Sequence, residues 1–419
     1  MPIATTKTKQ HSSPPPAGAP AFARIIGLDL HPDIFTAGTL VGTNPLGAQL
    51  TSMQHAVPIG DLGKWAGKQL QRGDLLVCEA GSNSFEIIGQ LRRLGHTCLC
   101  LESSRVGQTE DANFNDDRSA AEKIARIYLS GLCKVVWDPD SQTREYRELL
   151  GIHQEAVRGA TRAKNSLRGY LNEHGVRLPK GTVLTKPQGE QLALTSYEWS
   201  SNQRVMVSDL FAQVRHHDAR RKAYHTRIAS VIAGDQRMLG LMRLLGINVV
   251  NAFALVATIG DITRFASPKK LVAYLGLVAR REKSGTSIDR KGGCRGVGRK
   301  DMRTLLVQAA QSVLNSRAKG SGEVLRKWGW KVFARRGKRA IAVIAIARKL
   351  AVSAWYHLRG LAHPHKTEEV ERLRRKFAMF AVHVPKENIQ ELGFASKKAF
   401  IDDLIVRFTQ TQATTTKMT

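Results

Sequence analysis

The hydrophobic positions in the first third of the chain form short apolar runs separated by amphipathic stretches. Short runs bounded by turn residues predict strands, and apolar positions that recur every three or four residues predict helices. We expect the first strand to end on Asp29 and the fourth to end on Glu79. The predicted strands are 24–29, 35–41, 46–52, 75–79 and 97–101, and the predicted helices are 59–72, 83–94 and 117–130. Strands that alternate with helices after an opening meander indicate an α/β domain with a mixed sheet.

The middle of the chain holds two long helical patterns that are dense in arginine and lysine, at 142–173 and 203–243. The segment 175–189 between them contains prolines and glycines, which predict a loop. Two long helices around a loop predict a helical hairpin or coiled-coil arm, either a dimerisation element or a spacer.

The pattern after residue 244 is mostly helical. We expect helices at 252–259, 269–275, 299–314 and 339–358, and a loop rich in glycine and arginine at 276–298. The stretch 326–349 contains nine Lys or Arg residues and no acid.

The two ends of the chain differ from the rest in composition. The first residues are rich in Pro, Ser, Thr and Ala, and the last eleven are rich in Thr and Gln, so both predict flexible segments. An amphipathic helix of unknown role is expected at 372–384. The predicted organisation is a leader at 1–23, an α/β domain at 24–140, a helical hairpin at 141–243, a mainly α-helical domain at 244–361, and a helix with a flexible tail at 362–419.

The charge of the chain indicates the kind of partner that it binds. The 419 residues include 64 Lys+Arg and 35 Asp+Glu, which gives a net charge of +29 and indicates a polyanion partner. With 42% hydrophobic residues the chain can bury a core. We expect no membrane span, because no run of about 18 apolar residues occurs, and a cytoplasmic location, because no apolar signal region precedes residue 24.

The cysteines favour a reducing compartment. There are five of them, an odd number, and no Cys-x-x-Cys pair occurs. Zinc sites need about four Cys or His ligands in paired clusters. Buried, reduced thiols are therefore the better interpretation.

Four carboxylates occupy positions where they could act together. Asp29 and Glu79 end apolar strands, and Asp116 and Asp117 stand at the start of a helix. Such carboxylates can converge on one sheet edge and hold two divalent cations about 4 Å apart, the geometry for phosphodiester displacement. Mg2+ prefers oxygen ligands. The alternative is that Asp29 ends a strand and Asp117 caps a helix. We favour the metal site for the whole set.

Three segments then carry a specific resemblance. Ile26-Gly-Leu-Asp29, Val77-Cys-Glu79-Ala-Gly81 and Asn115-Asp-Asp117-Arg-Ser-Ala-Ala-Glu-Lys-Ile-Ala resemble the amino-terminal domain of DEDD-type insertion-sequence transposases. That family includes the pilin-gene invertases and the bridge-RNA-guided recombinases. The resemblance implies a RuvC-like domain with a ribonuclease H-like fold.

The carboxyl-terminal half resembles the second conserved domain of the same family. The matching segments are Leu255-Val-Ala-Thr-Ile-Gly-Asp261, Arg264–Leu277, Lys283-Ser284-Gly285 and Arg299–Leu306. Each motif alone is weak, but their order and spacing make a strong match over most of residues 25–360.

The resemblance assigns roles position by position. Asp29 matches the first aspartate of the family, Glu79 its glutamate and Asp117 its third acid. The fourth acid of the family falls on Ala120, so this sequence departs from the pattern. Either Asp116 substitutes or the site works with three acids, which puts cleavage competence in question. Mg2+ or Mn2+ is the implied cofactor.

Ser284 matches the serine that, in this family, attacks the DNA phosphate. A serine needs an activating base, and metal-bound water or a carboxylate of the first domain could take its proton. Without the resemblance, Ser284 would be a turn residue; Ser287 is its nearest rival. Cations around Ser284 could stabilise phosphate charge, and glycines let the backbone approach it. The predicted nucleic-acid contacts are Arg280, Arg281, Lys283, Arg290, Lys291, Arg295, Arg299 and Lys300.

Two further features are less decisive. Gly246-Ile-Asn248 stands where relatives show a Gly-x-Gly helix-hairpin-helix turn, and asparagine tolerates the positive φ of the second glycine. Trp328, Trp330 and Phe333 lie among basic residues, where they could stack on bases; core packing is the more frequent role of such residues.

The expected function is a transposase or site-specific recombinase of a mobile element, acting on DNA as a dimer or tetramer in the bacterial nucleoid. Similar proteins use a structured guide RNA. The alternatives are a metal-dependent, resolvase-like nuclease without serine chemistry, and a non-catalytic nucleic-acid-binding protein.

Overall fold

The computed structural model describes residues 22–102, 117–131, 133–279, 281–284, 288–291, 294, 298–317, 321–361 and 370–410. For 117–119, 281–284, 288–291, 321 and 409–410 only the backbone is described. The chain divides into two compact units, residues 1–139 and 140–419, and we describe each by itself.

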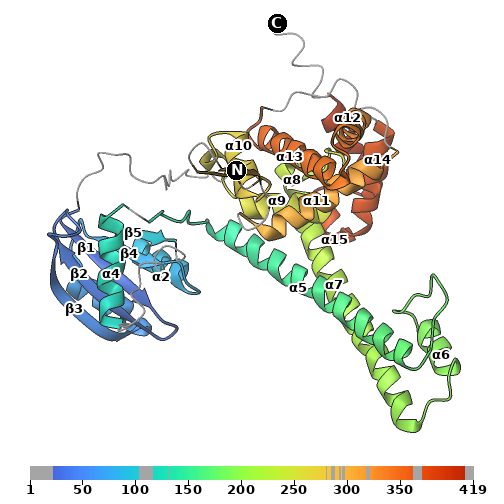
Figure 1. Cartoon of the computed structure of the whole chain (residues 1–419), viewed down its shortest axis with the longest axis horizontal. Helices are drawn as coiled ribbons and strands as arrows, with labels where there is room; N and C mark the ends of the chain where they lie inside the picture. Colours follow the sequence, from blue (N-terminus) through green and yellow to red (C-terminus); the bar gives the residue numbers. More distant parts are fainter. Residues whose placement is uncertain are drawn as a thin grey trace, which may run out of the picture. The chain divides into compact units, whose positions relative to one another are not determined.

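The first unit is built on a mixed five-stranded sheet in the order β3-β2-β1-β4-β5 (Figure 1). The strands are β1 (Arg24–Leu30), β2 (Ile34–Val41), β3 (Gln49–Pro58), β4 (Leu75–Glu79) and β5 (Thr97–Leu101). The first three form an antiparallel meander, whereas β4 pairs parallel with β1 and β5 pairs parallel with β4. The predicted α/β domain with a mixed sheet is confirmed.

Both faces of this sheet are covered because residues of the central strands alternate between two cores. One core contains Leu28 and Cys78 and packs against α1 (Leu62–Gln69) and α2 (Ser84–Arg93). The opposite core contains Ile25 and Val77 and packs against α4 (Asp117–Leu129).

Glycine permits the close approach of α4 to the sheet. A Cβ on Gly27 would lie 1.9 Å from the carbonyl oxygen of Ala121. The backbones of β1 and α4 are therefore in direct contact, which fixes the height of the helix above the strand.

Some element boundaries differ from the predictions. β3 runs over 49–58 rather than 46–52, because residues 43–47 form the turn after β2. The predicted helix 59–72 is a short 3-10 turn, η1 (Ile59–Asp61), followed by α1, which ends at Gln69. The helix before Gly95 ends as predicted, with Gly95 at φ +93°.

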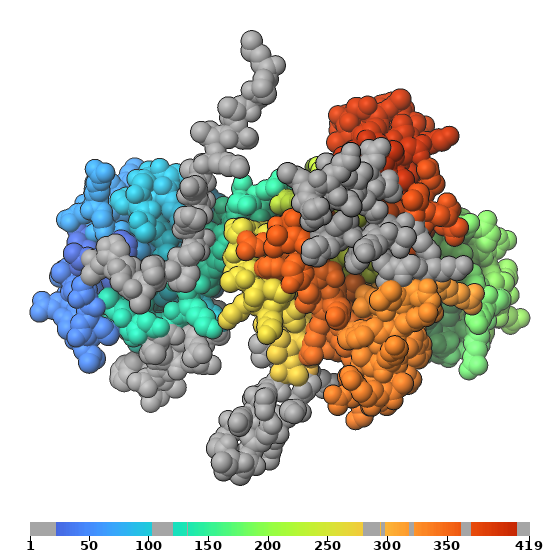
Figure 2. All heavy atoms as spheres, turned by 90° about the horizontal axis from the view of Figure 1, so that it is seen from above, coloured from blue at the N-terminus to red at the C-terminus, as the bar shows by residue number. Residues whose placement is uncertain are grey.

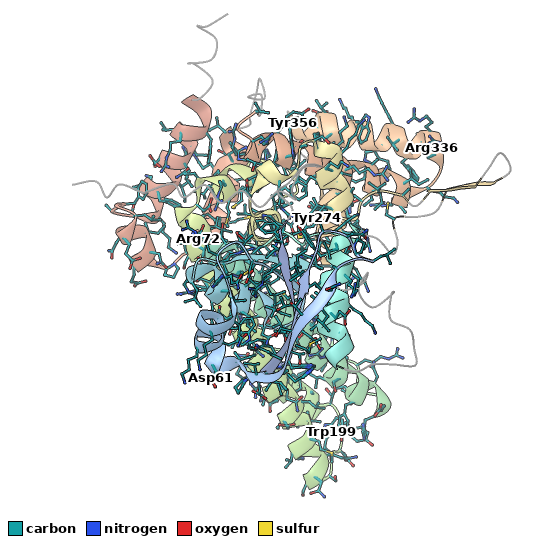
Figure 3. All side chains as sticks on the ribbon, turned by 90° about the vertical axis from the view of Figure 1, so that its left-hand side faces the viewer. Asp61, Arg72, Trp199, Tyr274, Arg336 and Tyr356 are labelled. Atoms are coloured by element: carbon teal, nitrogen blue, oxygen red, sulfur yellow. The ribbon has the colours of Figure 1, made fainter. Side chains whose placement is uncertain are left out.

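The second unit begins with a long helical hairpin (Figure 1). Helix α5 (Ser141–Glu173) and helix α7 (Ser201–Gly234) lie side by side, and α6 (Pro187–Thr195) stands in the connection between them. Trp199 marks the far end of this hairpin in Figure 3. The hairpin was predicted, but α6 was not. The predicted helix 203–243 also breaks at Asp235, whose side chain caps α8 (Gln236–Leu241).

In the remaining part, ten of the eleven residues of α9 (Val249–Ile259) are buried. Helix α9 contacts α5, α7, α8 and α11 (Lys300–Asn315), whereas α13 (Arg339–Leu358) packs against α11 and α10 (Pro268–Tyr274). The same core extends to α14 (Val370–Val382) and α16 (Lys397–Gln410). The other elements of this part are η3 (Ile262–Arg264), α12 (Ser321–Arg336) and α15 (Lys386–Glu391). Figure 2 shows the yellow and orange segments of this unit in contact on the face in view.

Two findings modify the predictions for this region. The segment expected to be a loop contains a two-stranded antiparallel hairpin of β6 (Arg281–Ser284) and β7 (Ile288–Lys291). Among the described helices, α13 is long and apolar enough to cross a membrane by composition alone. Its Ile346, Leu350 and Trp355 are buried in the helical core.

Candidate active site and nucleic-acid surface

Asp29 and Glu79 come together at one edge of the sheet. Leu28 of β1 is in register with Cys78 of β4, so the next residue on each strand is Asp29 and Glu79. Adjacent strands lie about 4.8 Å apart. The prediction that strand ends bring these two acids together therefore agrees with the register, although Leu30, not Asp29, ends β1.

Both acids lie on the face that α4 covers. Residues 25, 27 and 29 share one side of β1, and 75, 77 and 79 share that side of β4, by strand alternation. Ile25 and Val77 pack in the core beneath α4. The Asp29 side chain is 22% exposed, and Glu79 is half-buried. The site is therefore an accessible edge rather than an enclosed core.

Helix α4 starts over this edge. Ala121 contacts Gly27 in mid-strand, and farther along the helix Arg126 Nη1 donates to the Pro45 carbonyl at 2.6 Å. Pro45 belongs to the turn beside the beginning of β1. The helix thus runs antiparallel to β1, and its first residue, Asp117, lies toward Asp29 and Glu79.

The other acidic candidates are located less completely. Asp117 is described as backbone only, and Asp116 falls outside the described residues. Ala120, at the position of the missing fourth acid, is half-buried in the first turn of α4. Among the described residues no three Asp, Glu, His or Cys side chains form a metal-binding group. Asp29 and Glu79 supply hard oxygen ligands of the type that Mg2+ prefers, so the residues present are compatible with the implied ion.

A histidine that the sequence reasoning missed lies beside Asp29. His31 Nε2 is 3.4 Å from Asp29 Oδ2. The loop that carries His31 is held by Asn83, which precedes α2 and donates from Nδ2 to the His31 carbonyl at 2.7 Å. The signal for this residue was its position two residues after Asp29.

Three of the four cysteines of residues 1–139 are buried in the opposite core, whereas Cys133 is half-buried and packs against the core beneath α4. Cys78, Cys98 and Cys100 are all buried, and the five cysteines are free thiols. Burial raises the pKa of Cys98 to about 12, so its thiol stays protonated at neutral pH.

Ser284 is the last residue of β6, in register with Ile288 of β7. The hairpin also carries Arg281, Lys283, Arg290 and Lys291 as described backbone. The other predicted residues of this segment, Arg280, Ser287 and Arg295, lie outside the described residues. The hairpin thus places Ser284 at the turn between two strands rather than in an open loop.

The remaining predicted contacts, Arg299 and Lys300, lie at the start of α11. Arg299 precedes the helix and donates from Nε and Nη2 to Asp301 at 3.0 and 2.7 Å. The hydrogen bond to Asp301 raises the pKa of Arg299, so the guanidinium stays positively charged at neutral pH. Lys300 is exposed.

The turn before α9 differs from the prediction for Asn248. Gly246 takes a positive φ of +83°, and a Cβ there would lie 2.7 Å from the Ala309 carbonyl oxygen. Asn248 has φ −96° and caps α9 by accepting from the Asn251 amide. The expectation that Asn248 replaces a glycine at positive φ is therefore wrong, because its side chain is used as a helix cap.

The aromatic residues of α12 have mixed surroundings. Trp328 packs against the helical core, whereas Trp330 is 40% exposed and donates from Nε1 to the Leu314 carbonyl at 3.2 Å. Phe333 meets Trp330 edge to face at 5.6 Å. Core packing explains Trp328, and Trp330 keeps part of its ring in solvent.

Charge is divided unequally between the two units. Residues 1–139 contain 13 Lys+Arg and 13 Asp+Glu, whereas residues 140–419 contain 51 and 22. The entire excess of +29 therefore belongs to the second unit. The candidate carboxylates stand in a unit with no net charge.

Comparison with known proteins shows which proteins the chain is similar to. Residues 239–323, from α8 into α12 and including Ser284, match the transposase domain of the IS116/IS110/IS902 family. This part of the chain is similar to insertion-sequence transposases. The recognition of such a family from the sequence motifs is confirmed.

The relatives that match the chain are described as transposases. A putative transposase, y4qE, of Sinorhizobium fredii is 25% identical over 300 residues, which cover 66% of this chain and 73% of the relative. A probable family 20 transposase of Pseudomonas aeruginosa is 25% identical over 283 residues, covering 67% and 82%. The transposase for element IS1111A of Coxiella burnetii is 25% identical over 249 residues, covering 57% and 65%. They support a transposase role for the chain, which implies DNA as a partner.

Proposed function

We propose that the chain is a transposase that cuts and rejoins DNA with a divalent-metal site on Asp29, Glu79 and Asp117 and with Ser284 as nucleophile. The observation that carries the proposal is the register of β1 and β4, which brings two carboxylates to one edge under the start of α4. The mixed sheet is compatible with the ribonuclease H-like fold that the sequence resemblance implies.

The carboxylates would hold Mg2+ or Mn2+, with Asp116 as the substitute for the acid missing at Ala120. The bound ion supplies charge stabilisation at the phosphate and lowers the pKa of water. The chain itself orients the ligands: strand pairing fixes Asp29 against Glu79, and His31 Nε2 lies 3.4 Å from Asp29 Oδ2.

Ser284 would attack the phosphorus of the scissile phosphodiester. The bond from Oγ to phosphorus forms, the bond from phosphorus to the leaving deoxyribose oxygen breaks, and the serine proton passes to a base. A second hydroxyl then displaces the serine and restores a phosphodiester. The position of Ser284 at a hairpin turn favours exposure to a substrate, and Arg281, Lys283, Arg290 and Lys291 on the same hairpin provide cations for the phosphate.

The partners follow from charge and from the resemblance. The excess of +29 on residues 140–419 supports a polynucleotide load, which we propose to be DNA together with a structured guide RNA. Strand exchange needs several active sites, so assembly as a dimer or tetramer is part of the proposal.

Asp29→Asn tests the metal site. Recombination is measured on a plasmid carrying both ends of the element, with Asp33→Asn as the control because Asp33 is an exposed acid in the neighbouring turn. We expect at least a hundredfold loss for Asp29→Asn and Glu79→Gln, loss without added Mg2+ or Mn2+, and wild-type activity for Asp33→Asn. Equal activity of wild type and Asp29→Asn would refute the metal-site proposal.

Ser284→Ala tests the nucleophile. A suicide DNA substrate traps the covalent protein–DNA link, and Ser287→Ala serves as the comparison. We expect the adduct with wild type and with Ser287→Ala and none with Ser284→Ala. An adduct that persists in Ser284→Ala, or DNA cleavage that proceeds without any adduct, would favour a different nucleophile or a metal-dependent nuclease.

A further inference from the structure

The second unit contains a large cavity that the proposed chemistry does not use. It has a volume of about 1170 Å³ and is lined by α5, α7, α9, α11 and α14 and by the turn at Gly246; we name it the α9–α11 cavity. Its volume exceeds that of a typical small-ligand site, roughly 300–1,000 Å³. It is therefore large enough to accept a nucleotide with parts of its neighbours.

The amino-terminal ends of two helices meet at this cavity. Asn248 and Asn251 line it from the first turn of α9, and Lys300, Asp301 and Thr304 line it from the first turns of α11. Helix amino termini carry partial positive charge and favour anions. The contact of Gly246 with the Ala309 carbonyl holds the start of α9 against α11.

Cations on four different elements line the same space. They outnumber the one lining acid, Asp301, by six to one. Several are held in place by other contacts: Arg221 donates to Asp218 at 2.9 Å, and Lys376 donates to the Leu244 carbonyl at 2.8 Å. The six are Arg158, Arg221, Arg299, Lys300, Arg372 and Lys376.

A buried imidazole in the wall provides an independent indication of a ligand. His153 is 4% exposed, and within the described part of the chain its Nδ1 has no hydrogen-bond partner. The ring of His225 lies 6.0 Å from it and also lines the cavity. Burial lowers the pKa of His153 and, together with His383, His153 and Arg221, lowers that of His225 to about 4. Both rings are thus neutral at pH 7 and can donate or accept hydrogen bonds.

We propose that the α9–α11 cavity receives an unstacked nucleotide of a single-stranded polynucleotide, with the base toward His153 and the phosphates among the lining cations. The inference deepens the proposed function and rests on it in one respect, because strand exchange exposes unpaired nucleotides. Single-stranded bases are recognised by hydrogen bonds at their edges, which the amides of Gln154 and Gln308 and the hydroxyl of Ser312 can supply.

The concave shape of the cavity favours an unpaired nucleotide over one that is base-paired in a duplex. A duplex presents its bases edge-on within grooves, and only an extruded base enters a pocket. The apolar part of the wall, including Leu245, Ile247 and Leu305, suits the face of a base, whereas phosphates alone would need no such surface.

Gln308→Trp tests the site with Gln311→Trp as its matched control. Both glutamines are exposed on α11, but only Gln308 lines the cavity. A tryptophan at 308 would fill the space without changing the charge. The measurement is the Kd of the full-length protein for fluorescent 12-mers of DNA, of RNA and of duplex DNA, at constant salt. We expect Gln308→Trp to weaken single-strand binding about tenfold, and Gln311→Trp to stay within twofold of wild type.

The outcomes separate this site from the proposed catalysis. A selective loss for the DNA 12-mer or for the RNA 12-mer supports the proposal and names the strand that enters. Equal effects of both tryptophans, or an equal loss for the duplex, would overturn it. Ser312→Trp, also exposed in the lining, gives the same test if Gln308→Trp does not fold. The binding measurement requires no cleavage of DNA, so a failure of the proposed metal site leaves this result intact.

Discussion

Gly27 is the residue on which the geometry of the candidate metal site depends most directly. It lies two residues before Asp29 and allows α4 to rest on β1. Because a Cβ at this position would lie 1.9 Å from a backbone oxygen, Gly27→Ala must push the helix away from the strand.

We expect Gly27→Ala to lower the free energy of unfolding by about 2–4 kcal/mol. Gly63→Ala is the control, because Gly63 is exposed in α1 and a Cβ there meets nothing within 4 Å. Alanine favours the helix at that position, by up to about 1 kcal/mol. Urea unfolding of both variants measures the difference; similar values for the two would contradict the close packing of α4 on β1.

His225 gives a pH-dependent stability with a defined sign. Its pKa in the folded protein is lowered to about 4 by burial and by His383, His153 and Arg221, against an ordinary value of about 6.5. Between these values the unfolded chain binds a proton that the folded chain does not, so stability falls as the pH drops from about 6.5 toward 4. Because the ring is partly exposed, we expect an effect of order 1 kcal/mol.

Thermal unfolding at pH 7.5 and pH 5 checks this sign. His225→Gln should reduce the loss of Tm between the two values, whereas His55→Gln, at an exposed position on β3, should leave it unchanged. A wild-type protein that is as stable at pH 5 as at pH 7.5 would show that His225 is not buried in its neutral form.

At the scale of elements, the α5–α7 hairpin depends on how its second helix starts. Ser200 accepts from the Gln203 amide, and Gln203 Oε1 accepts from the Ser200 amide, which forms a complete capping box. We expect Ser200→Ala to cost about 1 kcal/mol and to speed amide exchange in the first turn of α7. Ser201→Ala, one residue farther along, removes no cap and should match wild type in the same hydrogen-exchange measurement.

The elements also show which patterns the sequence could reveal. The strands at 24, 35, 75 and 97 are predictable because each is a short apolar run, and the ends of two of them predict that Asp29 and Glu79 converge on one sheet edge. The β6–β7 hairpin was missed because Arg-Glu-Lys-Ser and Ile-Asp-Arg-Lys have almost no apolar face. The break at Asp235 was missed because apolar positions continue through it into α8.

No local pattern in the sequence predicts the α9–α11 cavity. Its walls come from positions as far apart as His153 and Lys376, which only tertiary packing brings together. His31 could have been found, since it follows Asp29 by two residues. The direction of α4 could not, because it depends on the contacts of Ala121 and Arg126 with residues about 80 to 95 positions earlier.

At the scale of the whole molecule, the positive charge of residues 140–419 predicts that salt weakens the binding of nucleic acid to that unit. Nucleic-acid affinity should fall steeply with NaCl, and each phosphate contact that is removed should lower the log–log slope by about 0.9. We expect Arg336→Ala, at the exposed end of α12, to reduce this slope, and Arg72→Ala, exposed in the first unit, to leave it unchanged (both are labelled in Figure 3). Equal slopes for the two variants in a salt titration of Kd would contradict the assignment of binding to residues 140–419.

The absence of net charge on residues 1–139 has a consequence for how such a protein searches a genome. Residence on arbitrary DNA is driven by counterion release from the second unit, whereas the unit that carries Asp29 and Glu79 contributes no overall attraction to phosphate. We therefore expect time spent on DNA and frequency of cleavage to be separable properties. Substitutions that lengthen the time for which the protein stays bound to DNA need not raise the rate at which it cleaves non-target sequences.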